Sequence, residues 1–397
     1  MLGDSLVFHP GLGVEGGYDT NPLRLNEDVQ GAGRLRITPY LDLATRSKKQ
    51  KIKDEGVVES TPPKVDFRFG LAGWYDMFFA KDAAVDDQDH FGVDTHLNFI
   101  LFPEGTFSLL ADAMYLRSLQ PYESSEEHWA WHMIKPGLGF QLRPGGGTLT
   151  FELGYRLSLM LYEDSNLAKT NNKMTHDVRF QTSWKIMPKT ALITRVNFSP
   201  NIYTKEPGGT IVQNNDSMPV RGLFGIQGLL SPKFGLSLFV GYGASFYETG
   251  DDFDHLLAQG ELMFFITPTA NIRLGGQRDF VDSYYANYYT KTGGYLKYEQ
   301  MFGGIFLASL KGDVFYRGYS TMLDTGGDFT PSSNSRGDVW IGGTLLLEVR
   351  LTDWLSIHAS GKYSGDVSDF QYESEEWPNV AVSFHRFEAL LGVRGHY

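Results

Sequence analysis

Charged side chains recur at alternate positions inside otherwise apolar stretches, and these residues are the best placed to act on a solute. Between Leu149 and Leu161, for example, Glu152 and Arg156 alternate with leucine and aromatic residues. Arginine suits carboxylates because its planar guanidinium offers a fork of N–H donors. Two interpretations stay open: the charges pair across strands and stiffen a wall, or they line a wet passage for a polar or anionic solute. The candidate lining residues are Arg68, Asp94, Asp112, Glu152, Arg156, Arg179, Arg195, Arg221, Glu261, Arg273, Lys311 and Arg350.

One further segment, from Thr45 to Lys64, is strongly basic and sits where a short turn is expected. A solvated excursion is one interpretation, because an excess of like charge favours disorder. A docking arm for an acidic periplasmic partner is the other, since clustered cations attract such partners and also bind anionic head groups. The cations of this arm are Arg46, Lys48, Lys49, Lys51 and Lys53.

Signatures of enzymes and of bound cofactors are missing. The sequence contains no His-Glu-x-x-His and no Gly-x-Ser-x-Gly, and the glycines at 145–147 lack the lysine of a phosphate-binding loop. The acidic run Asp251, Asp252 and Asp254 lacks the spacing of a calcium loop, so solvated loop charge is the expectation. We therefore expect a non-enzyme without catalytic residues, metal or cofactor.

These charges need strands to position them. In Leu149 to Leu161 the odd positions are leucine or aromatic and the even positions are mostly polar, which is the period of a strand with one apolar and one wet face. Similar stretches recur between turns, and the pattern predicts an all-β transmembrane antiparallel up-and-down β-barrel of about 18 strands, with short periplasmic turns and long outer loops. One domain covers residues 1–397. The turns fall at Pro103, Pro144, Pro188, Pro232, Pro268, Gly303 and Thr352-Asp353.

Composition agrees with this class. The chain has 397 residues, a net charge of −12 and no cysteine, and its acidity argues against a nucleic-acid binder. Mean hydropathy is −0.25, and no run approaches the ~18 apolar residues of a spanning helix. The start, Met1 to Asp4, has neither a basic region nor an apolar stretch, so we expect a mature form from which a signal peptide was removed.

The last stretch of the chain, Phe387 to Tyr397, alternates in the same way. Leu391 and Val393 fall on one face, and Glu388 and Arg394 fall on the other. A final strand that ends on an aromatic residue resembles the closing strand of Gram-negative outer-membrane β-barrel proteins. The resemblance implies closure of the last strand against the first, a place in the outer membrane, and contact with outer-membrane lipid and lipopolysaccharide.

A weaker resemblance lies near the start. The phrase Gly16-Gly17-Tyr18-Asp19-Thr20-Asn21-Pro22 resembles the first strand of large barrels linked to surface-polysaccharide export or other trans-envelope machines. It implies an outer-membrane conduit with a periplasmic export partner and a polysaccharide as cargo. The alternatives are a passive porin or uptake channel, and a plugged structural barrel that anchors a trans-envelope or motility apparatus.

Overall fold

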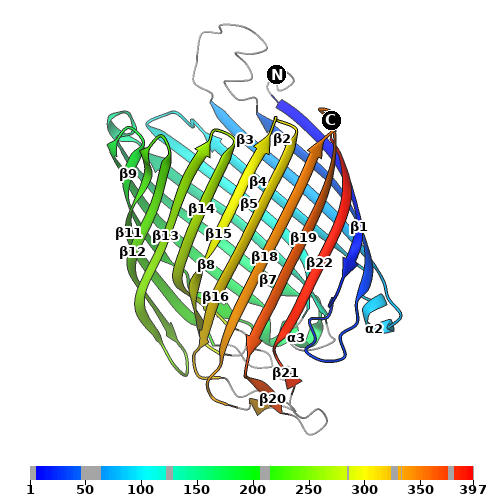
Figure 1. The fold of residues 1–397 in the computed structure, drawn as a ribbon. Coiled ribbons are helices and arrows are strands. Elements are labelled where there is room, and N and C mark those ends of the chain that lie inside the picture. The colour runs from blue at the N-terminus through cyan, green and yellow to red at the C-terminus, as the bar shows by residue number, and fades with distance from the viewer. Residues whose placement is uncertain are drawn as a thin grey trace.

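The chain forms one closed β-barrel (Figure 1). The computed structural model describes residues 6–45, 64–121, 128–205, 215–283, 286–322, 330–331, 333–373 and 380–396. Nineteen strands form one sheet. Two of them, β9 (Thr190–Phe198) and β10 (Asn201–Tyr203), share one position, because both pair with β8 (Lys173–Met187) and β11 (Ser217–Ser231). The wall therefore has 18 positions, which confirms the predicted up-and-down barrel.

Each wall strand is antiparallel to its neighbours. The other wall strands are β1 (Leu6–Asp19), β2 (Ala32–Thr45), β3 (Val65–Phe79), β4 (His90–Leu101), β5 (Phe107–Pro121), β6 (His128–Leu142), β7 (Leu149–Tyr162), β12 (Phe234–Tyr247), β13 (Phe253–Thr267), β14 (Ala270–Asp282), β15 (Tyr288–Phe302), β16 (Phe306–Tyr319), β18 (Gly337–Arg350), β19 (Leu355–Ser368) and β22 (Phe384–His396). The smaller elements are α2 (Ala83–Asp86), the 3-10 turn η1 (Pro144–Gly147), α3 (Ser165–Asn171), β17 (Thr330–Pro331), β20 (Gln371–Glu373) and β21 (Val380–Ala381).

The two ends of the barrel differ as predicted. The end that carries both termini has short turns, such as residues 188–189 and 232–233 (Figure 1). The other end has longer loops, including residues 80–89 with α2 and 163–172 with α3, and the small sheet of β17, β20 and β21. We call the first end periplasmic and the second outer, in keeping with the usual asymmetry of such barrels. The basic arm at residues 46–53 lies outside the described residues.

Large apolar side chains cover the outside of the wall. Leu138 of β6 is 69% exposed and Leu256 of β13 is 71% exposed. Exposed apolar residues in such numbers, on one parity of strand after strand, are stable only against lipid. Exposed tyrosines such as Tyr75 and Tyr242 lie toward the outer ends of their strands, where an interfacial belt is expected. No helix within the described residues is long and apolar enough to cross a membrane.

Closure joins the last strand to the first, as the terminal alternation predicts. β1 pairs with β22 over nine positions. At the outer end of this seam, Arg386 donates to Asp19, while Arg34 contacts Asp76 at 2.9 Å and Glu388 at 2.8 Å. Asp19 and Asp76 are fully buried. Buried carboxylates are stable only when several donors satisfy them, so this network fastens the seam through matched charge.

Candidate functional site

The inner face of the wall is polar. On β7, Leu153 and Tyr155 are exposed on the outside, whereas Arg156 has the opposite parity. Its Nη2 lies 2.7 Å from Oδ2 of Asp112 on β5, so the side chain reaches across β6 inside the barrel. Gly137 of β6 makes this possible, because a Cβ there would lie 2.6 Å from Oδ1 of Asp112. A glycine on the middle strand therefore lets charges two strands apart meet.

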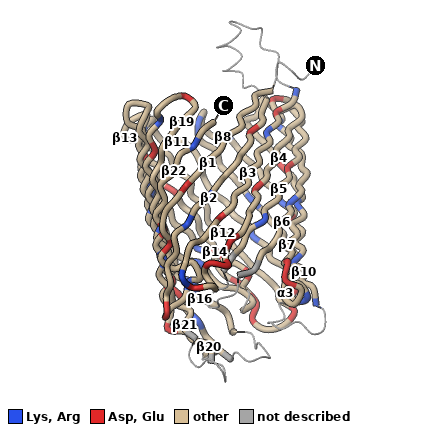
Figure 2. The backbone as a smooth tube through the Cα atoms, turned by 90° about the vertical axis from the view of Figure 1, so that its right-hand side faces the viewer, with Lys and Arg blue, Asp and Glu red and all other residues tan. Residues whose placement is uncertain are grey.

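Six of the predicted lining cations form ion pairs with a carboxylate. Four of these pairs join residues two apart on one strand, and the Arg221 and Arg156 pairs join different strands. The pairs are Arg156–Asp112 at 2.7 Å, Arg179–Asp177 at 2.9 Å, Arg221–Asp279 at 3.1 Å, Lys311–Asp313 at 3.4 Å, Arg68–Asp66 at 3.6 Å and Arg350–Glu348 at 3.8 Å. Figure 2 shows that positive and negative residues are spread along the strands, which allows such pairing.

The remaining predicted lining residues contact neutral groups or none. Asp94 makes no side-chain hydrogen bond or ion pair with the part of the chain that the structure describes. The others bind as follows: Arg195 donates to Gln181 at 2.9 Å, Arg273 to Asn271 at 3.2 Å, Gln141 to Glu152 at 3.4 Å, and the hydroxyl of Tyr295 to Glu261. That a passing solute meets any of these residues stays a prediction.

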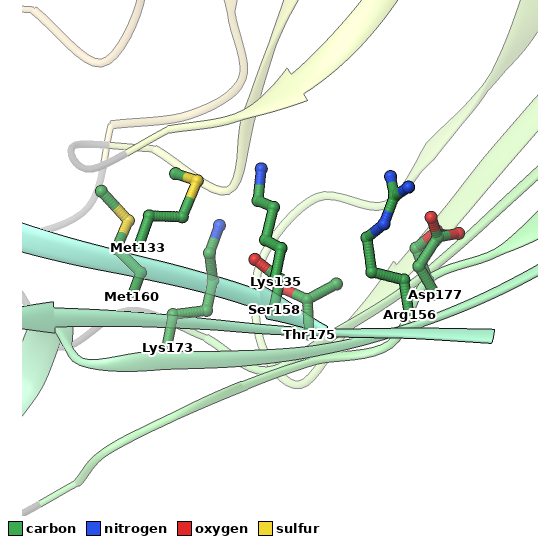
Figure 3. Close-up of a pocket in the computed structure, with 9 residues that line it drawn as sticks. Met133, Lys135, Arg156, Ser158, Met160, Lys173, Thr175 and Asp177 are labelled. Atoms are coloured by element: carbon green, nitrogen blue, oxygen red, sulfur yellow. The ribbon is translucent and has the colours of Figure 1, made fainter. Parts of the chain in front are cut away.

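A recess of about 280 Å³ lies on the inner face of β6, β7 and β8. Lys135, Arg156 and Lys173 project into it from these three strands, side by side and on the same side of the sheet (Figure 3). Lys173 contacts Asp282 at 3.5 Å, but Lys135 has no carboxylate within ion-pair distance among the described residues. Methionine thioethers and hydroxyls complete the lining, from Met133, Met160, Ser158, Thr175 and Ser199, with Asp177 as its acid.

Beside this recess the wall departs from a simple barrel. β13 and β14 pair from Thr267–Ala270 to Ala258–Arg278 and no further, although both strands continue toward the outer end. β14 and β15 stay paired as far as Asp282–Tyr288. We call Asp279–Asp282 the tucked segment, because its side chains contact the inner faces of strands β8 to β12 rather than β13 alone.

An aromatic cluster packs the tucked segment against the wall. Phe280 stacks on Phe253 of β13 with ring centroids 4.0 Å apart, and both side chains are buried. A Cβ at Gly243 of β12 would lie 2.9 Å from Cε1 of Phe280, so the ring rests directly on that strand. Strand parity places Phe280 on the outward side of β14. There the ring packs on the inner faces of β12 and β13, which separate it from lipid. The other buried members are Ile193, Leu223, Phe239 and Leu257.

Polar contacts hold the end of the same segment. The carboxylate of Asp282 accepts hydrogen bonds from Asn201 of β10 at 2.6 Å and from the Tyr247 hydroxyl of β12 at 3.3 Å. It also contacts Lys173, which lines the recess. The tucked segment therefore narrows the lumen next to the cationic recess.

Sequence reasoning missed two parts of this site. Lys135 could have been found, because Ile134 and Leu138 set the outward parity of β6 and so place Lys135 inside. The tucked segment could not, because Phe280 has the type and parity of a lipid-facing residue. Only the missing pairing with β13 distinguishes it.

Carboxylates fasten two outer loops, one to wall strands and one to a neighbouring loop. Glu163 accepts from Nε of Arg117 at 2.7 Å and from Nε2 of His132 at 2.9 Å, and the hydrogen bond from Arg117 holds the pKa of this carboxyl below its ordinary value. Asp251 accepts from the hydroxyl and the backbone N–H of Thr321, which lowers the pKa of Asp251. Among the described residues no group of three or more His, Asp or Glu is placed to hold a metal ion.

A scan against protein-family models gives no match, and neither does a search of curated proteins. Solved structures with a similar layout include the outer-membrane protein OpdK from Pseudomonas aeruginosa, with 9% identity, a TM-score of 0.48 and coverage of 98% of this chain and 99% of that chain. OccAB4 from Acinetobacter baumannii has 10% identity, a TM-score of 0.49 and 99% coverage of both chains. The siderophore receptor PirA from Pseudomonas aeruginosa has 9% identity, a TM-score of 0.45 and coverage of 98% and 80%.

Similarity at this level carries no argument about the solute. The assignment rests on this chain's own closed wall, its exposed apolar outer face and its polar inner face. The chain is a closed 18-stranded antiparallel β-barrel with an apolar outside and a polar inside, the arrangement of outer-membrane β-barrels.

Proposed function

We propose that the protein is a passive channel through which small anionic solutes cross the outer membrane. The observation that carries this proposal is the recess on β6 to β8. Its lining contains three cations, Lys135, Arg156 and Lys173. Arg156 and Lys173 each contact a carboxylate, Asp112 and Asp282, so Lys135 is the cation that carries the proposal. Lys135 has no acidic partner among the described residues, and its charge is therefore available to a solute.

Physical reasons connect this recess to anion passage. Charges of one sign inside a cleft with low-dielectric walls concentrate mobile ions of the opposite sign. Guanidinium and ammonium groups next to hydroxyls offer the donors that carboxylates and phosphates accept. Lys173 lines the recess and also contacts Asp282 of the tucked segment. The recess therefore lies beside the part of the lumen that the tucked segment occupies. A solute that passes this level is expected to meet the recess.

Polysaccharide export, which the sequence resemblance put first, has less support. Its physical argument depends on the basic arm at residues 46–53, which lies outside the described residues. A narrowed lumen with a cationic recess suits a small ion better than a long neutral polymer. A plugged structural barrel would need the tucked segment and the loops to close the lumen entirely.

Reversal potentials in planar bilayers test the proposal. The purified full-length protein, under a salt gradient, should prefer the anion. Replacing Lys135 by glutamine should lower the anion-to-cation permeability ratio by roughly twofold to fivefold, since about 0.5–1 kcal/mol of attraction is lost. The control is Lys189→Gln, which removes the same charge from the exposed turn between β8 and β9. An unchanged ratio for Lys135→Gln, or equal shifts for both variants, would refute the role of the recess.

A further inference from the structure

The edge of β13 that faces the tucked segment is free to pair with it. The last pair between β13 and β14 is Ala258–Arg278. In an antiparallel pair of strands, residue numbers rise along one strand as they fall along the other. The same register would place Leu256 opposite Phe280 and His255 opposite Val281. β13 remains a strand over this length, because it stays paired with β12 as far as Ser245–Phe253. The unpaired edge therefore has the length and register that the tucked segment needs.

The unpaired edge of β13 lies near the outer surface of the membrane, where backbone groups can remain without a strand partner. Leu256 lies opposite Tyr242 of β12, an exposed tyrosine of the outer aromatic belt. An unpaired strand edge cannot lie in the hydrocarbon region, because no water is present there to bind its backbone groups. At and beyond the tyrosine belt, water reaches the edge. The wall can therefore exist with this stretch unpaired, and a lateral opening into the acyl chains is not required.

Side chains replace the missing strand partner of the tucked segment. The backbone N–H of Phe280 donates to Oδ1 of Asp279 at 2.8 Å, and its carbonyl accepts from Nη2 of Arg221 at 2.7 Å. The Arg221 guanidinium also contacts Asp279 at 3.1 Å and lies 3.8 Å from the centre of the Phe280 ring. One arginine of β11 thus holds the backbone, the carboxylate and the ring of the tucked segment.

We propose that the tucked segment is a displaceable constriction with two positions. In the narrow position it lies against the inner faces of β8 to β13, held by Arg221 and by the contacts of Asp282. In the wide position it pairs with β13 from His255 to Leu257, and the outer end of β15 moves with it because β14 and β15 stay paired. The exchange replaces side-chain contacts and apolar packing by ladder hydrogen bonds, so the backbone of the tucked segment has partners in both positions. This inference goes beyond the proposed function and holds whichever ion the lumen prefers.

Cysteine pairs can trap each position in the full-length protein. His255→Cys with Val281→Cys joins residues that meet only in the wide position, and neither side chain is buried in the aromatic cluster. Oxidation of this pair should form a disulfide and raise single-channel conductance, and reduction should restore it. Asn201→Cys with Asp282→Cys joins side chains that touch in the narrow position. A short thiol cross-linker on this second pair should abolish openings to the higher level.

Release of the arginine clamp gives an independent test. Arg221→Gln should increase severalfold the fraction of time spent at the higher conductance level. The control, Arg278→Gln, removes an exposed arginine of β14, the strand that carries the tucked segment. Among the described residues its side chain donates to Thr292 of β15 and not to the tucked segment. Heat-modifiable gel mobility verifies that each variant is folded. If the 255–281 disulfide does not form, or forms without a change in conductance, or if Arg221→Gln behaves like its control, the constriction is fixed and the inference is wrong.

Discussion

At the scale of single residues, glycines decide which charges meet inside the barrel. Gly137 lets Arg156 reach Asp112, and Gly392 of β22 lets Glu15 of β1 contact His358 of β19 at 2.7 Å. In each case the glycine lies on the strand between the two partners. The alternation of the sequence predicts the inward face, but it does not reveal such contacts, because they depend on which strands are neighbours.

A methyl group added at such a glycine should separate the two partner side chains. A Cβ at Gly392 would lie 2.7 Å from Cγ of Glu15 and 2.8 Å from the ring of His358, so Gly392→Ala should push the pair apart. We expect a loss of about 1–3 kcal/mol of stability, the usual cost of overpacking. The control is Gly16→Ala on the adjacent strand β1, where a Cβ would meet nothing within 4 Å. Denaturant unfolding in detergent measures both, and equal stability of the two variants would contradict the account.

At the scale of elements, the outer loops are fastened by a few ionised side chains. The loop that contains α3 begins with Glu163, whose carboxylate receives Arg117 and His132 from β5 and β6. The sequence predicts long outer loops, but it could not pair Glu163 with Arg117, which lies 46 residues earlier. Predicting this contact would require the relative register of β5, β6 and β7.

The lowered pKa of Glu163 predicts how this loop responds to acid. Because the folded pKa lies below the unfolded value of about 4.3, the contact contributes fully above that value. It is lost as the pH falls through the lowered folded pKa. Limited digestion with pepsin should therefore leave the α3 loop intact to a lower pH than in Arg117→Gln, which lacks the first donor. If both proteins are cut at the same pH, Arg117 does not hold the loop.

The elements also show where sequence reasoning stops. The strands, their number and the sides of turns and loops follow from period-two alternation and from turn residues such as Pro188 and Pro232. The displacement of the end of β14 does not, because Phe280 is an aromatic residue at an outward position, as in any wall strand. This displacement follows from packing of Phe280 on Gly243 and Phe253, which are distant in sequence.

At the scale of the whole molecule, the barrel combines an apolar outside, a charge-paired inside and one doubled part of the wall. The charge of the chain is −12, yet the recess that borders the narrowed lumen carries more cations than acids. Within this recess, Lys135 is a cation that no carboxylate among the described residues neutralises. A cation in this place suits the proposed passage of anions, because charged side chains beside a constriction influence which ions pass.

Solute entry into proteoliposomes tests the central claim most directly. Vesicles that contain the full-length protein are exposed in turn to a monosaccharide carboxylate, a neutral monosaccharide of similar size and a neutral oligosaccharide, and swelling rates are compared with those of protein-free vesicles. The account predicts fastest entry for the carboxylate, slower entry for the neutral sugar and no entry for the oligosaccharide. Entry of the oligosaccharide at a rate similar to that of the small sugars, or no entry of any solute, would contradict a channel for small anions.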